Sequence, residues 1–338
     1  MATAIGSYNL TLSDFAKMEK PNGDIAELVN ILAQTNDLWK YLPFQECNDG
    51  TAHETTIVTG LPQGAWVRYN QGRTPAKGST AQIRAQTGMI ELPIVIDKHL
   101  AEKRGADRVA QARTKQAMLA IEGLTQQATT ALFYEDERTN PERITGLAPH
   151  YSTVNTATAA SAQNVIDCGG TGSDNLSIWM LELGEGKISG LLPQGKASGV
   201  QRLDRGIVDV TDSTGIAGST FLAYKEVLSW SLGLVVENWT CGVRLCNIDV
   251  SNLIANSGSQ ADLWTKIIMG LGKLPTSSMG KRVICMNRTA FTWLRIQALA
   301  KAAYQTTFET VEGKPVTMID GIPVCVCDAL LTTEARVV

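Results

Sequence analysis

The feature that most constrains the fold is a long amphipathic helix predicted over residues 105–133, after a strand-like run over 92–97. Small apolar residues recur there at helical spacing, while charged and amide side chains crowd the other side. The apolar set is Ala117, Ala120, Ile121, Leu124, Ala128, Ala131 and Leu132. At 1.5 Å per residue the helix would span roughly 40 Å, so its alanine-rich stripe needs a sheet laid along it. An ordinary long core helix is an equally good interpretation of this stretch alone.

Composition limits the class of protein. The chain has 338 residues, of which 44% are hydrophobic and 19% charged, and a formal net charge of -3, so it is long enough for two or three cores. A dedicated nucleic-acid binder would need clustered Lys and Arg, and the chain has no basic block. No apolar run approaches the ~20 residues of a membrane span, and residues 1–12 lack the pattern of a signal peptide. We expect a protein made and kept in a cytoplasm, without a membrane partner.

The cysteines predict buried, reduced thiols. Their number is odd, and most fall in apolar strand-like runs: Cys47, Cys168, Cys241, Cys246, Cys285, Cys325 and Cys327. Two pairs are closely spaced, 241 with 246 and 325 with 327, but none of His53, His99 and His150 lies at metal-ligand spacing from either pair. We therefore predict no metal site and no cofactor.

The first third of the chain reads as an arm followed by a ribbon. Residues 2–22 are polar and aperiodic, a short amphipathic helix is predicted from Asp24, and an apolar cluster over 38–44 could anchor the arm. Two long strands follow over 54–96, with an outgoing run through 55–59 and 65–69 and a return run through 81–86. Their polar tip, 70–80, carries Arg73 and Lys77. A two-stranded ribbon is marginal in water by itself, so packing on its own domain and packing on a neighbouring molecule are equally good interpretations.

The remainder predicts a sheet and then an α/β module. Runs over 178–183, 208–210, 220–224, 230–236 and 243–250 indicate a mostly antiparallel sheet. The module consists of a helix from Ala261, a strand over 282–286 and a helix over 288–304. A pair of strands closes it, 316–319 with 324–326, around Asp320 and Gly321.

No stretch predicts an active site. Residues 190–196 nearly form a phosphate loop, but Ala197 stands where a Ser or Thr should hold magnesium, and Pro193 removes a backbone donor. The glycines over 169–172 follow no clear strand and open no helix. Neither G-x-S-x-G nor H-E-x-x-H occurs.

A series of short motifs, each unspecific alone, runs in order along nearly the whole chain. They are Thr35-Asn36-Asp37, Thr59-Gly60-Leu61-Pro62 before Trp66 and Arg68, Gly88-Met89, Ile96-Asp97-Lys98, Leu132-Phe133-Tyr134-Glu135, Thr145-Gly146-Leu147-Ala148-Pro149, Asn247-Ile248-Asp249-Val250, Asn287-Arg288-Thr289 and Asp320-Gly321-Ile322-Pro323-Val324. In this order and spacing they resemble the major capsid proteins of tailed bacteriophages.

The resemblance implies the HK97-like α+β shell fold. We expect an N-terminal arm over 1–50, an extended two-stranded loop over 51–98, a peripheral domain over 99–257 with its spine helix, and an axial α/β domain over 258–338. The strand block 178–249 precedes the α/β module here, whereas similar strands follow it in better-known members, which suggests a permuted chain order.

The resemblance also implies a function. We expect a structural protein and not an enzyme, whose hexamers and pentamers form an icosahedral virion shell around phage double-stranded DNA, assembled in the bacterial cytoplasm. The expected partners are other copies, a separate scaffolding protein, a portal, decoration proteins and, non-specifically, packaged DNA. We predict that Trp66, Arg68, Arg73 and Lys77 contact a neighbouring subunit. The alternatives are a decoration or tail protein, and a soluble α/β enzyme that uses Lys196 or Cys241.

Overall fold

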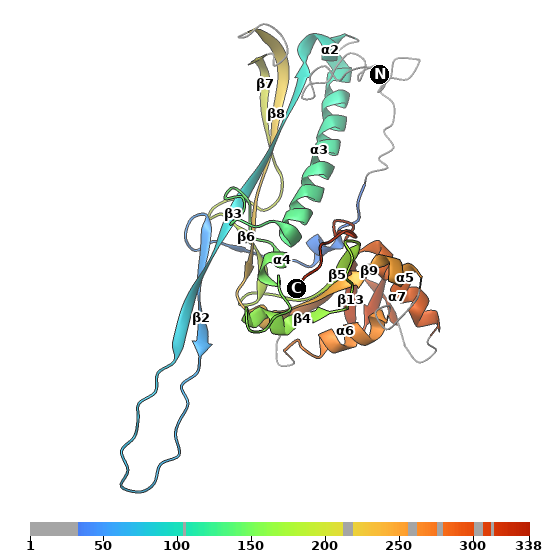
Figure 1. The fold of residues 1–338 in the computed structure, drawn as a ribbon. Coiled ribbons are helices and arrows are strands. Elements are labelled where there is room, and N and C mark those ends of the chain that lie inside the picture. The colour runs from blue at the N-terminus through green and yellow to red at the C-terminus, as the bar shows by residue number, and fades with distance from the viewer. Residues whose placement is uncertain are drawn as a thin grey trace. The chain divides into compact units, whose positions relative to one another are not determined.

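The computed structural model describes residues 33–103, 106–211, 219–255, 262–275, 280–300, 307–311 and 314–338 (Figure 1). The predicted arm over 2–22 and the helix from Asp24 lie outside these residues. The chain forms two compact units. The first contains Met89–Ala128 and Ser198–Ser231, and the second contains Gln34–Gly88, Thr129–Ala197 and Leu232–Val338. The predicted division into arm, loop, peripheral and axial domains stays a prediction.

The long helix is confirmed as α3, Ala106–Tyr134, whose residues up to Ala128 belong to the first unit. It follows the short helix α2, Lys98–Glu102, which Asp97 caps by accepting a hydrogen bond from the Leu100 amide at 3.0 Å. The unit also contains the antiparallel pair formed by β7, Gln201–Thr211, and the first part of β8, Thr220–Val236. The runs 220–224 and 230–236, which the sequence analysis separates, are one strand. A small core of Ile96, Ala101 and Val109 joins these elements, with Tyr224 packed against it.

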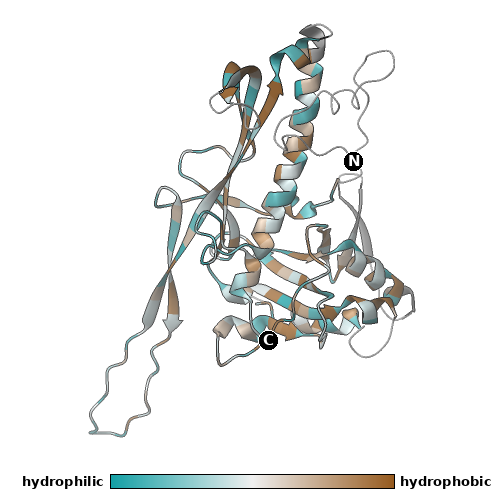
Figure 2. Ribbon diagram, turned by 45° about the horizontal axis from the view of Figure 1, so that its top comes forward, coloured by the Kyte–Doolittle hydropathy of each residue, from teal (hydrophilic) through white to brown (hydrophobic). Residues whose placement is uncertain are grey.

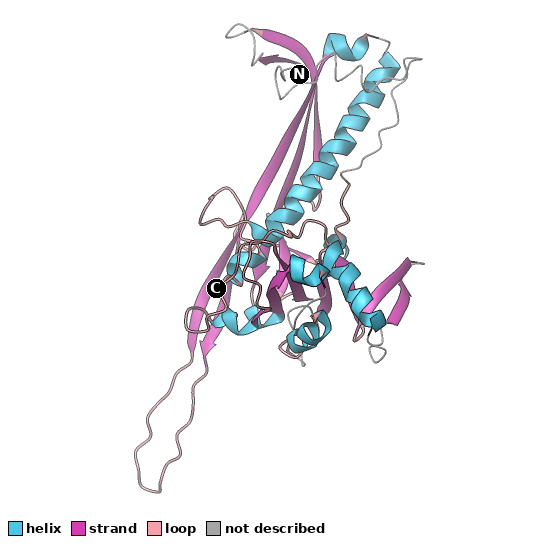
Figure 3. Ribbon diagram, turned by 45° about the vertical axis from the view of Figure 1, so that its right-hand side comes forward, coloured by secondary structure: helices cyan, strands magenta, loops and turns pink. Residues whose placement is uncertain are grey.

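The predicted ribbon is confirmed in the second unit, where β2, Ala52–Gly60, pairs antiparallel with β3, Ser79–Asp97. The predicted continuation of the outgoing strand over 65–69 is wrong, because β2 ends at Gly60 and residues 61–78 form a loop (Figure 3). Pro62 cannot donate to a ladder, and Gly64 weakens a strand interior. Without a paired partner, the apolar residues beyond them are not enough to extend the strand.

A larger sheet forms the body of the second unit. Strand β5, Asn175–Leu183, lies between β9, Gly242–Asp249, and β10, Lys281–Met286, and is antiparallel to both. Strand β13, Ile322–Val326, is parallel to β10, and β12, Lys314–Ile319, pairs antiparallel with β13 and with β11, Thr307–Val311. Three short strands complete the pairing. Strand β1, Phe44–Glu46, pairs with β6, Ile188–Leu192. Strand β4, Val165–Asp167, pairs with β9. The sheet is mostly antiparallel, as predicted.

This sheet contains strands of both the block 178–249 and the α/β module. Strand β7 and most of β8 belong to the first unit. The permuted chain order that the resemblance suggests stays a prediction.

Helices cover the sheet of the second unit. They are α4, Leu147–His150, α5, Val250–Ile254, α6, Leu263–Leu271, and α7, Arg288–Ala300, with 3-10 turns at Asp37–Lys40 (η1), Ala160–Asn164 (η2) and Trp239–Cys241 (η3). The main core lies under α6 and α7, and its largest members include Ile178, Met180, Leu245, Trp264, Ile267, Ile284 and Leu294. Residues 301–304, the predicted end of α7, lie outside the described residues. None of the described helices is both long enough and apolar enough to cross a membrane.

The apolar cluster over 38–44 anchors the start of the described chain. Leu38 is buried in η1, and the Trp39 indole donates a 2.8 Å hydrogen bond to the Thr129 hydroxyl. Phe44 stacks on Trp39 with ring centroids 6.1 Å apart. Its ring would lie 2.5 Å from a Cβ at Gly190, so only glycine fits at this point of β6.

Candidate functional site

The loop over 61–78 is the most exposed part of the second unit. Trp66 and Tyr69 are fully solvent-exposed, and Leu61 and Val67 are also exposed. The same loop contains Arg68, Arg73 and Lys77, all exposed, and no acidic residue. The four predicted contact residues, Trp66, Arg68, Arg73 and Lys77, therefore lie on one basic, partly aromatic loop, whose residues Figure 2 colours mostly pale and teal.

Few contacts with other described residues hold this loop. A turn joins Arg68 and Gln71, with the Gln71 amide 3.3 Å from the Arg68 carbonyl oxygen. Asn70 in this turn has a φ of 63°, which asparagine tolerates better than most residues. Among the ion pairs of the described residues, none includes a cation of the loop. The loop thus presents rings and charges that the described part of the chain leaves exposed.

The root of the ribbon is fixed, in contrast to its tip. Glu237 directly follows β8, and its side chain is only 8% exposed. Its Oε1 atom lies 3.0 Å from Nε2 of His53 and accepts a 2.8 Å hydrogen bond from the Thr55 hydroxyl. Asn48 also exchanges hydrogen bonds with the backbone of Glu54. These contacts set the direction in which the ribbon leaves the unit.

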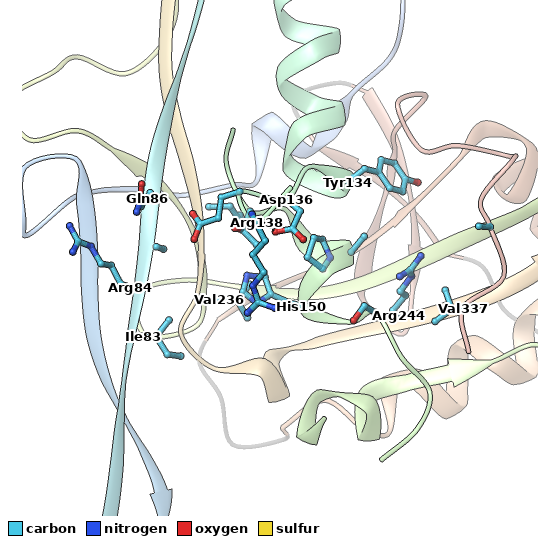
Figure 4. A pocket seen from close by; sticks show the side chains of 18 of the residues that line it. Ile83, Arg84, Gln86, Tyr134, Asp136, Arg138, His150, Val236, Arg244 and Val337 are labelled. Atoms are coloured by element: carbon cyan, nitrogen blue, oxygen red, sulfur yellow. Dashed lines mark hydrogen bonds between the residues drawn. The ribbon is translucent and has the colours of Figure 1, made fainter. Parts of the chain in front are cut away.

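A pocket of about 620 Å³ opens beside this root (Figure 4). The pocket is lined by residues of β3, of the connection between α3 and α4, of α4 and of the C-terminal segment, among them Arg84, Asp136, Arg138 and His150. Burial and the nearby Arg138 lower the pKa of His150, so its ring is neutral near pH 7. The pocket is a polar hollow at the ribbon root, and neither Lys196 nor Cys241 lines it.

The two groups that an enzyme would use are poorly placed for chemistry. Lys196 is exposed in a turn closed by its own amide and the Pro193 carbonyl oxygen, 3.1 Å apart. Cys241 is buried, and burial raises the pKa of its thiol, which disfavours the nucleophilic thiolate. The amide of Gly190 already donates to the Pro43 carbonyl oxygen, so the near-match to a phosphate loop lacks a free donor there.

Three groups of polar or thiol side chains meet in the folded chain and, apart from the close spacing of Cys325 and Cys327, nothing in the sequence predicts that their members lie together. In the first unit, Arg113 of α3 is paired with Glu226 and, at 2.5 Å, with Asp204. In the second unit, Arg244 and Glu334 form a buried ion pair at 2.9 Å. The third group consists of the thiols of Cys285, Cys325 and Cys327. Each group joins residues from different elements, so only an alignment with co-varying positions could have predicted them.

Comparison with known proteins places these features in a family context. A family model described as major capsid protein GP7 matches residues 20–338. A cryo-EM structure of bacteriophage Epsilon15 is similar to the chain at 31% sequence identity and a TM-score of 0.78, covering 99% of this chain and 99% of that one. The search of curated proteins gives no match.

Two further structures are similar at lower identity and with TM-scores below 0.5. The capsid of bacteriophage JBD30 is similar at 9% identity and a TM-score of 0.44, over 89% of this chain and 93% of that one. The holo-SrpI encapsulin complex of Synechococcus elongatus PCC 7942 is similar at 12% identity and a TM-score of 0.44, over 71% of this chain and 97% of that one.

Proposed function

The chain belongs to the major capsid protein GP7 family, and from this we propose that its copies close an icosahedral shell with the help of the exposed loop over 61–78. As a member of the family it is a structural protein of a phage capsid and not an enzyme. It has the HK97-like α+β fold, its copies self-associate into a capsid shell, and its place is the virion capsid.

One observation supports the role of the loop: its aromatic and basic side chains are exposed, and none of its cations forms an ion pair with another described residue. Tyr, Trp and Arg are the residues most enriched at protein interfaces and at their energetic hot spots. Trp66 and Tyr69 would bury their rings on a neighbouring copy, and Arg68, Arg73 and Lys77 would face acidic groups there. The fixed root and uncovered tip suit an element that reaches beyond its own subunit.

The finer features of assembly are part of the same proposal. Copies would form hexamers and pentamers through self-complementary edges, enclosing double-stranded DNA, in the cytoplasm of the bacterial host. A separate scaffolding protein, a portal and decoration proteins would be the other partners. The net charge of -3 agrees with DNA that is enclosed without being tightly held.

Substitutions at the exposed loop test the proposal without touching a core. In one variant Arg68, Arg73 and Lys77 are replaced by Glu, and in another Trp66→Ala removes a fully exposed ring. The control is Lys196→Glu, which reverses an exposed cation outside the loop. Each chain is co-expressed with a candidate scaffolding protein, and its assembly is followed by sedimentation and negative-stain electron microscopy.

We expect closed shells from the wild type and from Lys196→Glu. We expect a shift of the loop variants toward unassembled subunits with unchanged circular dichroism. Normal yields of equally heat-stable shells from both loop variants would refute the role of the loop while leaving the capsid function untouched.

A further inference from the structure

Three cysteines from two strands lie together on one face of the second unit's sheet. Cys285 in β10 is directly paired with Cys325 in β13. Cys327 lies two residues further along, and because side chains alternate between faces, it points to the same side as Cys325. The Cys327 amide donates a 3.0 Å hydrogen bond to the Met286 carbonyl oxygen, which holds this segment beside β10.

The spacing of the sulfur atoms is that of ligands around one ion. The three Sγ atoms lie within 4.8 Å of one another, and those of Cys325 and Cys327 are 3.7 Å apart. A zinc–sulfur bond is about 2.3 Å long, so sulfurs around one ion at trigonal or tetrahedral angles lie about 4 Å apart. An ion could therefore be bound with side-chain adjustments of a few tenths of an ångström, without a change in strand pairing.

The burial and the neighbours of the three cysteines indicate which kind of metal ion would fit. All three residues are fully buried, so hard cations that retain water ligands do not suit the site. The neighbouring residues of these strands, Ile284, Met286 and Val324, face the main core on the other side of the sheet. On the thiol side, η1 lies against β13, and Asn36 forms a bridge with Cys327. Three sulfur donors in such a place favour a soft ion of the zinc or copper(I) class.

We propose that Cys285, Cys325 and Cys327 bind one thiophilic d10 metal ion, zinc or copper(I), as three thiolates. Each thiol gives up one proton to solvent as its metal–sulfur bond forms, and no electron is transferred. Because the site is closed in the folded chain, the ion enters while the sheet forms, and its binding free energy adds to the stability of the fold. The site joins β10, β13 and the segment that follows β13, and it does not depend on the role proposed for the loop.

The test begins with metal analysis of the chain expressed with added zinc or copper and purified under reducing conditions without chelators. We expect about one ion per chain in the wild type. Cys327→Ala is expected to weaken binding by more than about 10-fold, the lower end of what loss of an outer-shell contact costs. The matched control is Cys241→Ala, which removes a buried thiol outside the group and is expected to retain the ion.

A second measurement uses the wild type alone, in case Cys327→Ala does not fold. The chain is refolded with cadmium, thiolate-to-metal absorption is recorded, and the folded protein is then denatured with a thiol-alkylating reagent present. We expect saturation at about one cadmium per chain and slower alkylation of three of the seven cysteines, identified by peptide mass spectrometry as those of the proposed site.

Wild-type chains that retain no zinc, copper or cadmium would overturn the proposal. Retention of a full equivalent by Cys327→Ala would do the same. So would a disulfide between two of the three cysteines in protein purified without reductant, because the group would then be a redox pair.

Discussion

At the scale of single residues, the ion pair between Arg244 and Glu334 is buried inside the second unit. Both side chains are only 5% exposed. The Arg244 guanidinium also donates to the Ser177 hydroxyl at 3.1 Å and the Tyr151 carbonyl oxygen at 3.0 Å, and it lies 5.0 Å from the centroid of the Trp179 ring. The guanidinium is thus fixed by three further groups, but Glu334 alone balances its charge within this network.

Glu334→Gln should therefore destabilise the chain by about 3–5 kcal/mol, the usual cost of leaving one charge of a buried pair uncompensated. Urea unfolding of unassembled subunits measures the change. The comparison is Asp49→Asn, which breaks the exposed pair with Arg84, 3.4 Å apart, and should cost less than about 1 kcal/mol. Equal effects of the two substitutions would mean that the buried pair contributes no more than a surface pair.

The histidine in the pocket predicts a pH dependence. Burial and Arg138 lower the pKa of His150 below its ordinary value of 6.5, so the unfolded chain binds this proton more readily than the folded chain. The stability that His150 contributes is complete above about pH 6.5 and is lost as the pH falls through the lower, folded pKa. His150→Gln should flatten the acid side of the curve of unfolding free energy against pH. His99→Gln, at an exposed histidine, serves as the control, and equal flattening by both would contradict the assignment.

At the scale of elements, Glu226 of β8 joins α3 to the β7–β8 pair in the first unit. It is 3% exposed and is paired with Arg113 of α3 and, at 2.7 Å, with Arg202 of β7. Glu226→Gln should destabilise this unit by about 1–3 kcal/mol, less than a fully buried pair costs, because Arg202 is half exposed.

Amide hydrogen exchange measures the effect of Glu226→Gln on the strands that Glu226 joins. Amides over 201–211 and 220–229 should exchange faster, by roughly tenfold for each 1.4 kcal/mol lost, while those of β5 keep their rates. Asp204→Asn, at a half-exposed carboxylate that also faces Arg113, should have a smaller effect. Uniformly faster exchange in both units would show that Glu226 supports the whole chain and not this joint.

The elements that sequence reasoning predicted correctly are those with a strong local pattern. Helix α3 has an uninterrupted apolar stripe, and the turn between β12 and β13 has Asp320 and Gly321 at φ values of 51° and 72°, the geometry that Asp-Gly favours in a two-residue hairpin. The predicted strand over 65–69 was wrong because apolar residues alone suggest a strand, whereas pairing with a neighbouring strand decides whether one forms. The prediction of two separate strands over 220–224 and 230–236 was wrong for the opposite reason. Pairing with β7 keeps the residues between them in one continuous strand, although their own pattern does not favour a strand.

At the scale of the molecule, the sequence could predict the family and the exposed loop, because both depend on local composition and on the order of motifs. It could not predict which distant residues meet. Cys285 and Cys325 are 40 positions apart and become neighbours only through the parallel pairing of β10 with β13. The prediction of no metal site rested on the spacing between histidines and cysteine pairs. That spacing says nothing about a site formed by three cysteines alone.

The basic loop makes shell assembly sensitive to salt. If Arg68, Arg73 and Lys77 face acidic groups of a neighbouring copy, raising the ionic strength from about 0.1 M to about 1 M shortens the Debye length from about 10 Å to about 3 Å and weakens that attraction. The subunit concentration needed for shells, measured by light scattering, should rise with salt for the wild type. Replacing the three cations by Gln should raise this concentration at low salt and reduce its salt dependence. Trp66→Ala should instead raise it at every ionic strength, since burial of the ring is not screened. An unchanged salt response in the Gln variant would mean that charges outside the loop govern assembly.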